Sequence, residues 1–421
     1  MKREDMLGNH AAERLMRSSA RSATPKTETP YRSSVMQFQH FAEAVCLAFA
    51  VCGSVYVALC AVTAAVFRMR MAHALRNASL PPVTIFKPLY GADKELLENL
   101  RSACRQDYPE YQVVLSVQRL DDPAIPAMRQ LLQEFGEARV TLVIAESEAR
   151  TNGKIQNLEI AFPFARHDLL IISDSDIKLR PDYLRAIVAP LADPAVGCVS
   201  TPYRAMNAAS WFEKLELLTM NADFVPNLIF ASVAGIVTFG LGASMCFRRA
   251  DLDAIGGFAA FRDYLAEDSH MAARIEALGR RVVLAPYFVD MEVDLESFAQ
   301  WWGHQLYWDQ NTRVIRPAGY FATVVVRAIP FALFYAALTG FGTAGLAVLA
   351  ATIAIRLAGT AFLLRAVLRD REGMSALWLL PLRDVLGLAV WFLAIVKRDF
   401  VHRGRRFGLL ADGRIVPRSA R

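Results

Sequence analysis

Charged residues are scarce in this 421-residue sequence, at 21%, and the formal net charge is only +6. The basic residues gather at the two ends and beside apolar runs instead of alternating with aromatic residues, so we expect no nucleic-acid partner. The six cysteines form no C-x-x-C pair, and three of them share one apolar stretch, which argues against a zinc site or a disulfide framework. Apolar residues make up 54% of the chain. This composition predicts one sizeable soluble domain attached to a few membrane segments.

The N-terminal region divides into a polar tail and a membrane anchor. Residues 1–40 are rich in Arg, Ser, Thr and Glu with little apolar periodicity, so we expect a disordered tail. Residues 41–68 contain a near-continuous apolar run, long enough to cross about 30 Å of hydrocarbon as a helix. Arg68 and Arg70 follow closely and place the next domain in the cytoplasm by the positive-inside rule. The run fits a signal peptide poorly, and Met36 directly before it is an alternative start.

Residues 81–316 have the pattern of an α/β domain. Short β-branched runs alternate there with amphipathic stretches, which predicts βαβ units around a mostly parallel sheet. The expected strands are VTIF, QVVLSVQ, RVTLVIAE and DLLIISDSD, and the expected helices cover residues 94–105, 125–135 and 157–164. The apolar run from Leu228 to Phe247 contains three glycines and leads into two arginines. We therefore expect a buried helix and strand there rather than a second membrane span.

The chain turns apolar again after this domain. Residues 317–397 hold candidate membrane segments near 321–339, 343–364 and 376–396, and we expect two or three of them to be membrane segments. Because a charge in mid-bilayer is costly, we expect four arginines of this region at interfaces or inside a helix bundle: Arg327, Arg356, Arg365 and Arg383. Residues 398–421 form a basic tail, which favours a cytoplasmic C-terminus and an even number of spans. Three candidate segments do not give an even number of spans. The first of them, near 321–339, is therefore a candidate for an interfacial helix.

The apolar segment LLIIS ends in Asp174-Ser175-Asp176. Two carboxylates at this spacing at the mouth of a strand can hold Mg2+ or Mn2+, which would bridge the oxygens of a diphosphate. Asp121 and Asp122 follow an earlier strand whose end meets the same crevice, so they can accept hydrogen bonds from a nucleoside. Taken alone, an acidic helix-capping turn explains the first pair at least as well, and an ordinary Asp-Pro turn explains the second.

Three further segments carry chemically active side chains. Lys154 begins a helix after a glycine, where a cation and free amides suit a diphosphate, although a solvated lysine is the alternative. Glu267 and Asp268 begin another helix, where capping explains one acid and Asp268 is the candidate general base for an acceptor hydroxyl. Just before the membrane segments, one or two helical turns predict an aromatic belt or a sugar or acceptor platform: Trp301, Trp302, His304, Gln305, Tyr307 and Trp308. The histidine and the glutamine favour the platform.

These motifs, taken in order, resemble those of the ceramide glucosyltransferases and their bacterial relatives, which are inverting enzymes of the GT-A fold. The likeness runs from about Val83 to Arg316 and is carried by KPLYGADKELLENLRSACRQDYPEYQVVLSVQRLDDPAI, NGKIQNL, DSDI, GASMCFRR, AEDSHMA and HQLYW. Within that family, MNADFVPN and HQLYWDQNTRVIRPAGY look like the bacterial glycosyltransferases of hopanoid biosynthesis. The resemblance implies an α/β domain of GT-A type with transmembrane helices on both sides, at the bacterial inner membrane.

The resemblance also implies the reaction. It is transfer of a sugar, N-acetylglucosamine in the hopanoid enzymes, from a UDP-sugar to a lipid hydroxyl such as that of bacteriohopanetetrol, with other hopanoid-pathway enzymes as possible partners. Glucosylation of ceramide from UDP-glucose is the alternative. A catalytically weak membrane protein that binds lipid or nucleotide-sugar is the second alternative.

Matched position by position, four residues of this sequence fall on the family's donor and catalytic sites. Asp122 matches the aspartate that contacts the nucleotide and is a candidate donor contact, as is Lys87 in the first matching segment. Asp174 matches the metal-linked aspartate, and Asp176 completes a D-x-D that some relatives lack. Asp268 matches the catalytic base.

The last motif departs from the family pattern. It ends in Trp308 as expected, but it opens with His304 and has Tyr307 where an arginine is usual. A neutral phenol cannot replace an arginine that steadies a leaving diphosphate, so Arg313 is a candidate to supply the charge. The remaining candidates for acceptor or diphosphate contact are Glu267 and Gln305.

Overall fold

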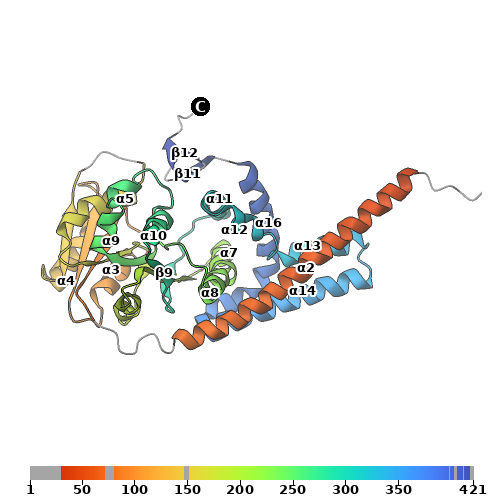
Figure 1. The fold of residues 1–421 in the computed structure, drawn as a ribbon, viewed down its shortest axis with the longest axis horizontal. Helices are drawn as coiled ribbons and strands as arrows, with labels where there is room; N and C mark the ends of the chain where they lie inside the picture. Colours follow the sequence, from red (N-terminus) through yellow and green to blue (C-terminus); the bar gives the residue numbers. More distant parts are fainter. Residues whose placement is uncertain are drawn as a thin grey trace, which may run out of the picture.

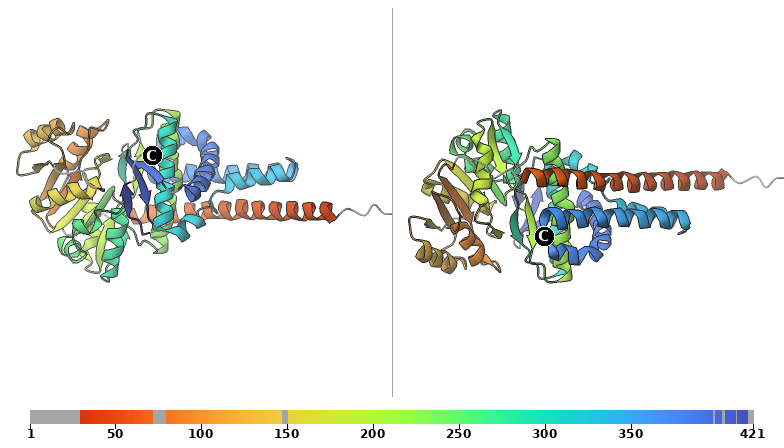
Figure 2. Two further views of the ribbon diagram at one scale, coloured as in Figure 1. Left: turned by 90° about the horizontal axis from the view of Figure 1, so that it is seen from above. Right: turned by 90° about the horizontal axis from the view of Figure 1, so that it is seen from below.

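The computed structural model describes residues 30–71, 80–146, 151–397, 399–402, 405–410 and 412–417. It consists of a sheet-containing domain and a set of long helices that project from it (Figure 1). The anchor helix α2 (Pro30–Met71) runs away from the domain, and two C-terminal helices lie beside it (Figure 2). This is the expected fold class, an α/β domain with apolar helices on both sides.

A seven-stranded sheet forms the centre of the domain, in the order β3-β2-β1-β4-β8-β6-β9. The first four strands in that order are parallel, whereas β8 runs antiparallel to both of its neighbours. Strands β1, β2 and β4 are buried along their whole length, which is typical of a parallel sheet covered on both faces. The strands are β1 (Val83–Pro88), β2 (Tyr111–Val117), β3 (Val140–Ile144), β4 (Leu169–Ser173), β6 (Val196–Ser200), β8 (Ser244–Arg248) and β9 (Arg281–Leu284).

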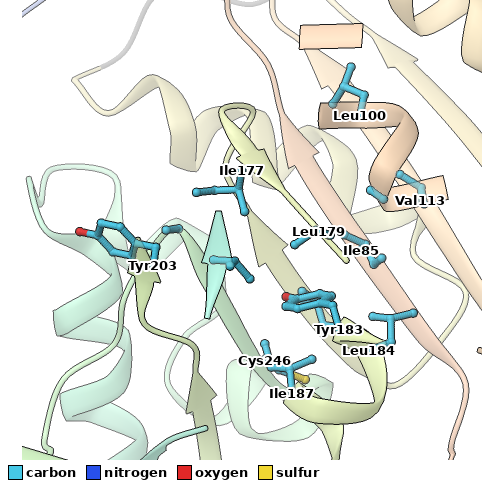
Figure 3. Packing of buried hydrophobic residues seen from close by; sticks show 14 of the residues in the cluster. Ile85, Leu100, Val113, Ile177, Leu179, Tyr183, Leu184, Ile187, Tyr203 and Cys246 are labelled. Carbon is cyan, nitrogen blue, oxygen red and sulfur yellow. The ribbon is translucent and has the colours of Figure 1, made fainter. Parts of the chain in front are cut away.

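Successive side chains of these strands point to opposite faces and enter two separate cores. Ile85 and Val113 pack in the first core, whereas Phe86 and Val114 pack in the second. Figure 3 shows the first core, in which Tyr183 lies near Ile85. The helices of the first core are α3 (Leu96–Cys104), α4 (Ile125–Phe135) and α6 (Tyr183–Val188), and those of the second are α5 (Gly153–Ala161), α9 (Arg249–Ala254) and α10 (Glu267–Ala277).

The expected elements of the domain are present. The four strands agree to within three residues, and α4 has the expected bounds. The helix expected near residues 157–164 begins at Gly153, in agreement with the helix start expected at Lys154, because the Asn152 side chain caps it by accepting from the amides of Lys154 and Ile155. The apolar run 228–247 divides into the end of α8 (Val225–Ala234) and β8, as expected, and α8 packs chiefly against α2.

A smaller sheet and a long helix complete the domain. The sheet has the order β5-β10-β7, with β5 (Ile177–Lys178), β7 (Tyr203–Met206) and β10 (Val289–Glu292). After β10 the chain enters α11 (Phe298–Ile315), which packs against α7 (Trp211–Thr219) and α16. The segment that the sequence placed in one or two helical turns is therefore part of an 18-residue helix.

Among the described residues, four helical segments are long and apolar enough to cross a membrane: Ser34–Met71, Trp211–Ala234, Thr343–Leu368 and Arg371–Val396. The second was not expected as a span and consists of α7, a π-helical turn η3 (Met220–Phe224) and α8. The first of the three C-terminal candidates is α13 (Ala328–Leu338), whose length of about 16 Å is half of a hydrocarbon core. The remaining helical elements are α12 (Pro317–Ala322), α14 (Thr343–Phe362), the π-helical turn η5 (Leu363–Leu368), α15 (Arg371–Ala376) and α16 (Leu380–Val396).

Three of the arginines in this region are buried between the helices, as expected. Arg356 pairs with Asp384 at 2.9 Å, and Arg383 pairs with Asp223 at 2.7 Å. Arg327 is 8% exposed. Pairing lowers the cost of a charge that is buried among apolar helices.

Both ends of the chain differ from the expectation. The helix α2 begins at Pro30, so the end of the tail expected over residues 1–40 is helical, and residues 1–29 lie outside the described residues. The extension is held by Gln39, whose amide donates to the carbonyl of Leu338 at 3.1 Å. The anchor is accordingly longer than the expected range 41–68.

The expected basic tail 398–421 is folded over most of its described part. It forms an antiparallel sheet of β11 (Asp399–His402), β12 (Arg405–Leu409) and β13 (Ile415–Pro417). Phe407 and Ile415 pack against Leu265, and the amide of Leu265 donates to the carbonyl of Gly413 at 3.2 Å. The buried apolar side chains explain why this segment folds despite its charge. It lies beside α10 and α11 (Figure 1).

Candidate active site

Several strands meet at one edge of the main sheet. Strands β1, β2 and β4 end at this edge, and the antiparallel β8 begins there, with Ser244 opposite Ser173. The loops after β2 and β4 carry four of the side chains that the sequence selected: Asp121, Asp122, Asp174 and Asp176. Parallel strands present ligands at their carboxyl ends, so this is the edge at which a nucleotide is expected.

The loop after β4 carries Asp174 and Asp176, and hydrogen bonds from Lys87 to its backbone hold it in place. The Lys87 ammonium is fully buried and donates to the carbonyls of Asp174 at 2.7 Å and Ile177 at 3.0 Å. Burial lowers the pKa of Lys87 to about 8, against the opposing effect of Asp176 and Asp174. Lys87 therefore holds the D-x-D backbone in place, and its expected contact with a nucleotide-sugar stays a prediction.

Asp176 offers a free metal-ligating atom. Its Oδ1 is buried and has no hydrogen-bond partner within the described part of the chain. Burial, and then the charge of Asp174, raise the pKa of Asp176 to about 7. An unsatisfied carboxylate oxygen beside a second carboxylate fits Mg2+ or Mn2+. The described residues contain no group of three or more His, Cys, Asp or Glu side chains placed to hold a metal, so diphosphate and water oxygens would complete the coordination.

Lys154 joins the D-x-D loop to the start of α10. Its Nζ lies 2.6 Å from Asp174 Oδ1 and 3.2 Å from Glu267 Oε1, and it donates to the carbonyl of Gly242 at 3.2 Å. Burial disfavours its charge, but the carboxylates of Asp174 and Glu267 raise the pKa of Lys154 well above its ordinary value. The ammonium is therefore charged and can face a diphosphate.

Asp268 is oriented by backbone amides. Its Oδ2 accepts from the amide of Gly242 at 2.6 Å, and its Oδ1 accepts from the amide of Ser269 at 2.7 Å. Burial, and then the charge of Glu267, raise the pKa of Asp268 to about 6, while Lys154 acts in the opposite direction. A carboxylate with a raised pKa is a stronger base and is still ionised at neutral pH, which suits the expected role of general base.

Two glycines allow this close packing, and neither was selected as a site residue from the sequence. A Cβ atom at Gly242 would lie 2.8 Å from Lys154 Nζ and 3.1 Å from Asp268 Oδ2. At Gly240 a Cβ would lie 2.6 Å from the carbonyl oxygen of Asp268. The G-x-G spacing just before β8 was the available signal, because glycine permits a backbone to approach a functional group closely.

The two aspartates after β2 have different surroundings. Asp122 is 4% exposed and accepts from the amides of Gly91 at 3.0 Å and Ala124 at 2.9 Å. It thus stabilises the loop after β1, where Gly91 has a φ of +74°. Asp121 is exposed and pairs with Arg119 at 2.8 Å. The buried member of the pair is the one that supports the crevice, and a nucleoside contact from either stays a prediction.

The loop after β1 also reaches the D-x-D loop. Ser175 donates to Asp93 Oδ2 at 2.9 Å. A continuous set of contacts therefore runs from Asp122 through the residues after β1 to Asp174 and Asp176. Asp122, Asp174, Asp176 and Asp268 thus lie at the same edge of the sheet, with Asp268 linked to Asp174 through Lys154, and their joint role at a donor site stays a prediction.

A second group of side chains lies on α11 around Glu216 of α7. Glu216 is 2% exposed, lies 2.9 Å from His304 Nδ1 and accepts from Gln305 Nε2 at 2.5 Å. Trp308 Nε1 donates to His304 Nε2 at 2.7 Å. Burial opposes protonation of the imidazole, but Glu216 outweighs it and raises the pKa of His304, with a smaller contribution from Asp176. The contribution of Asp176 places this group within electrostatic range of the D-x-D loop.

Glu216 was not among the residues expected from the sequence, and no local motif marks it. The available signal was a carboxylate flanked on both sides by leucines, because a buried acid requires partners. The two remaining candidates on α11 are Tyr307 and Arg313. Tyr307 packs with Phe407 of the C-terminal sheet. Arg313 lies about 13 Å further along α11 than His304, and its expected contact with a diphosphate stays a prediction.

Comparison with known proteins places the chain among glycosyltransferases. Ceramide glucosyltransferase 1 of Caenorhabditis elegans is 26% identical over 217 residues, which are 50% of this chain and 45% of that protein. The probable glycosyltransferase YdaM of Bacillus subtilis is 24% identical over 277 residues, or 62% of this chain and 63% of that protein. The chain thus spans about half the length of the nematode relative and somewhat more of the bacterial one.

The fold has a counterpart among solved structures. The mannosyltransferase PcManGT from Pyrobaculum calidifontis, solved in complex with GDP-Man and Mn2+, has a TM-score of 0.50 at 21% identity. The similarity covers 83% of this chain and 98% of that one, and at this identity it concerns the fold. The expected resemblance to ceramide glucosyltransferases and the expected GT-A type of domain are both confirmed. The model of glycosyl transferase family 21 matches residues 45–415, from the anchor helix to the C-terminal sheet, and the chain therefore belongs to that family.

Proposed function

We propose that this chain is an inverting, membrane-bound glycosyltransferase that transfers a sugar from a UDP-sugar to a lipid hydroxyl. One observation carries the proposal: Lys154 connects Asp174 to the start of α10, where Glu267 precedes the amide-oriented carboxylate of Asp268. A candidate base thus lies next to a candidate diphosphate and metal site. Such an arrangement allows an acceptor to be deprotonated at the donor sugar.

The residues divide the chemistry as follows. Asp268 accepts the proton of the lipid hydroxyl while the oxygen of that hydroxyl forms a bond to the anomeric carbon. The bond from that carbon to the diphosphate oxygen breaks on the opposite side, so the anomeric configuration inverts. Asp174 and Asp176 would hold Mg2+ or Mn2+, which when bound neutralises charge on the departing diphosphate. Lys154 adds a fixed positive charge at the same place.

The helices support a lipid acceptor. The α2 helix and three other segments have the composition of membrane spans, and Arg68 and Arg70 at the end of α2 favour a cytoplasmic domain. We propose the cytoplasmic face of a bacterial inner membrane as the location. An active site next to this membrane face could bind the hydroxyl of an acceptor whose acyl or ring portion remains in the bilayer.

Two acceptors are candidates. The sequence segments MNADFVPN and HQLYWDQNTRVIRPAGY favour a hopanoid polyol such as bacteriohopanetetrol, with N-acetylglucosamine as the sugar and enzymes of that pathway as partners. The ceramide glucosyltransferases among the relatives favour ceramide and UDP-glucose. Incubation of the purified chain with each lipid and each UDP-sugar, followed by mass spectrometry of the lipids, separates the two. A lack of glycolipid in every combination would refute the lipid transferase proposal.

Asp268→Asn tests the assignment of the base. We expect donor binding to remain within about two-fold and transfer to fall by at least about 100-fold, the usual contribution of a general base. Asp253→Asn on α9 is the matched control, because Asp253 is an exposed aspartate outside the crevice. Normal product formation by the Asp268 variant would remove the base from the mechanism.

A further inference from the structure

A half-enclosed pocket lies between the helices, outside the sheet crevice. It is formed by α2, by η3 and α8, and by the end of α14 with η5. Its apolar lining includes Val57, Ala61, Pro226 and Leu363. Two π-helical turns, η3 and η5, contact each other beside it. Such turns are rare and often occur at functional sites.

The polar lining contains an unused hydrogen-bonding group. Thr360 is 3% exposed and lines the pocket, and its Oγ1 has no hydrogen-bond partner among the residues that the structure describes. Across the pocket, Tyr56 donates to Asn227 Oδ1 at 2.7 Å. Asp223 also lines it and keeps 22% of its side chain exposed. A buried hydroxyl without a partner is costly, so a ligand that supplies one is favoured.

The charges around the pocket already balance. Arg356 pairs with Asp384 and donates to the carbonyl of Ala222, and Arg383 pairs with Asp223 and Asp384. Two arginines therefore face two aspartates, and the donors of these two arginines are largely occupied. Arg327, next to the lining residue Val326, lies 3.8 Å from Asp309 and has no partner for Nε and Nη1 among the described residues. A phosphate would have to compete with these carboxylates, whereas a neutral hydroxyl can bind without displacing an ion pair.

The pocket lies where the anchor leaves the domain. Ala64 and Phe67 of α2 pack in a core with domain residues, whereas Val55 and Val62 beside the pocket are exposed apolar side chains of the same helix. In the views from above and below, α2 continues from here away from the domain (Figure 2). A lipid bound here would place its polar head at the pocket and its apolar part along the exposed face of α2.

The pocket is also connected to the α11 group of the candidate active site. Asp223 lies seven residues after Glu216 on the continuous α7–η3 helix, or about 10 Å along its axis. Glu216 in turn contacts His304. We propose that the pocket binds the polar head of a neutral, hydroxyl-bearing membrane lipid, separately from the sugar-donor crevice. The identification of that lipid as the acceptor rests on the proposed function, whereas the binding itself does not.

Lipid binding to the purified full chain tests this inference. In a non-ionic detergent, 1-monooleoylglycerol is the neutral probe and dioleoylphosphatidylglycerol the anionic one, with bound lipid counted by native mass spectrometry. We expect saturable binding of monooleoylglycerol and weak competition by the anionic lipid. Equal or preferred binding of phosphatidylglycerol would overturn the proposal.

Two variants locate the site. Thr360→Val keeps the shape and removes the hydroxyl, so we expect monooleoylglycerol to bind about five-fold more weakly, the equivalent of one net hydrogen bond. Ala61→Leu fills the pocket, and we expect a loss of at least about ten-fold. Ala58→Leu is the matched control, because Ala58 lies on the exposed side of α2. Wild-type affinity in both pocket variants would refute the assignment.

Hydrolysis of UDP-sugar without lipid reports on the donor crevice separately. We expect the Thr360→Val variant to hydrolyse UDP-sugar at the rate of the unmodified chain. Its loss of lipid binding is then assigned to the pocket and not to misfolding or to the donor site. Loss of hydrolysis in the Thr360 variant, in parallel with lipid binding, would contradict two separate sites. Absence of any transferase activity in the unmodified chain would instead count against the proposed function alone.

Discussion

Replacing Lys154 with methionine tests whether its ammonium sets the working pH of Asp268. Lys154 lies 2.6 Å from Asp174 and 3.2 Å from Glu267, and its charge lowers the pKa of Asp268. Methionine keeps much of the side-chain volume and removes the charge. The pKa of Asp268, already raised to about 6 by burial and by Glu267, should therefore rise further.

The expected size of the rise in the pKa of Asp268 follows from the surroundings of Lys154. An opposite charge within a few Å shifts a carboxylate pKa by roughly one to three units. We take the lower end because the Lys154 side chain is 24% exposed and solvent screens its charge. A base whose pKa moves from about 6 to about 7 falls from about half ionised to about one-tenth ionised at pH 6, and is nearly fully ionised at pH 8 in both cases. The ratio of kcat/KM at pH 8 to that at pH 6 should increase about five-fold.

The assay is sugar transfer measured between about pH 5.5 and pH 8.5, the range in which a base of this pKa titrates. Lys214→Met on α7 removes a lysine outside the crevice and serves as the control. A second effect is expected at every pH, because Lys154 also faces the diphosphate site. A uniform loss with an unchanged pH profile would refute the coupling between Lys154 and Asp268, and would leave only the role of Lys154 at the diphosphate.

The remaining predictions concern the metal site, the glycine loop and the α11 group. Gly242→Ala should lower kcat at least about ten-fold with little change in donor KM, because the added Cβ would lie 2.8 Å from Lys154 Nζ; steady-state kinetics decides this. Removal of divalent metal with EDTA should abolish sugar transfer. Added Mn2+ should restore transfer less completely in the Asp176→Asn variant than in the unmodified chain. In the unmodified chain the Mn2+ concentration needed for half activity should rise below about pH 7, because a proton competes for Asp176. Glu216→Gln should lower the pKa of His304, seen by NMR titration of the imidazole, since Glu216 is the group that raises it.

Local sequence patterns determined most of the secondary structure. The helix Ile125–Phe135 has the expected bounds because its apolar residues recur at helical spacing and a proline stands at its start. Buried strands such as β4 were recognisable because both faces of a parallel strand must be apolar. The start of α5 at Gly153 agrees with the helix start expected at Lys154, whereas the range read from apolar periodicity began later, because a polar side-chain cap decides where that helix begins.

The resemblance to a known family identified the acidic residues, but the structure decided their relationships. Asp121 and Asp122 are adjacent in the sequence, and only folding makes one exposed and the other a buried support of the crevice. Lys87 was selected as a donor contact, and in the fold its ammonium holds the D-x-D loop. A side chain's partner depends on distances across the sheet, which no local pattern encodes.

The sequence by itself determined that the chain has an apolar anchor, an α/β domain and acidic motifs of a sugar-transferring family, because these depend on composition, periodicity and local order. Only the tertiary structure decided which groups meet. Glu216 and His304 are 88 positions apart, and Lys154 and Glu267 are 113 apart, yet each pair is in contact. Likewise, the basic C-terminal segment folds onto α10 because Phe407 and Ile415 find an apolar surface there. Contacts of this range depend on how whole elements pack, and a linear pattern carries no record of that packing.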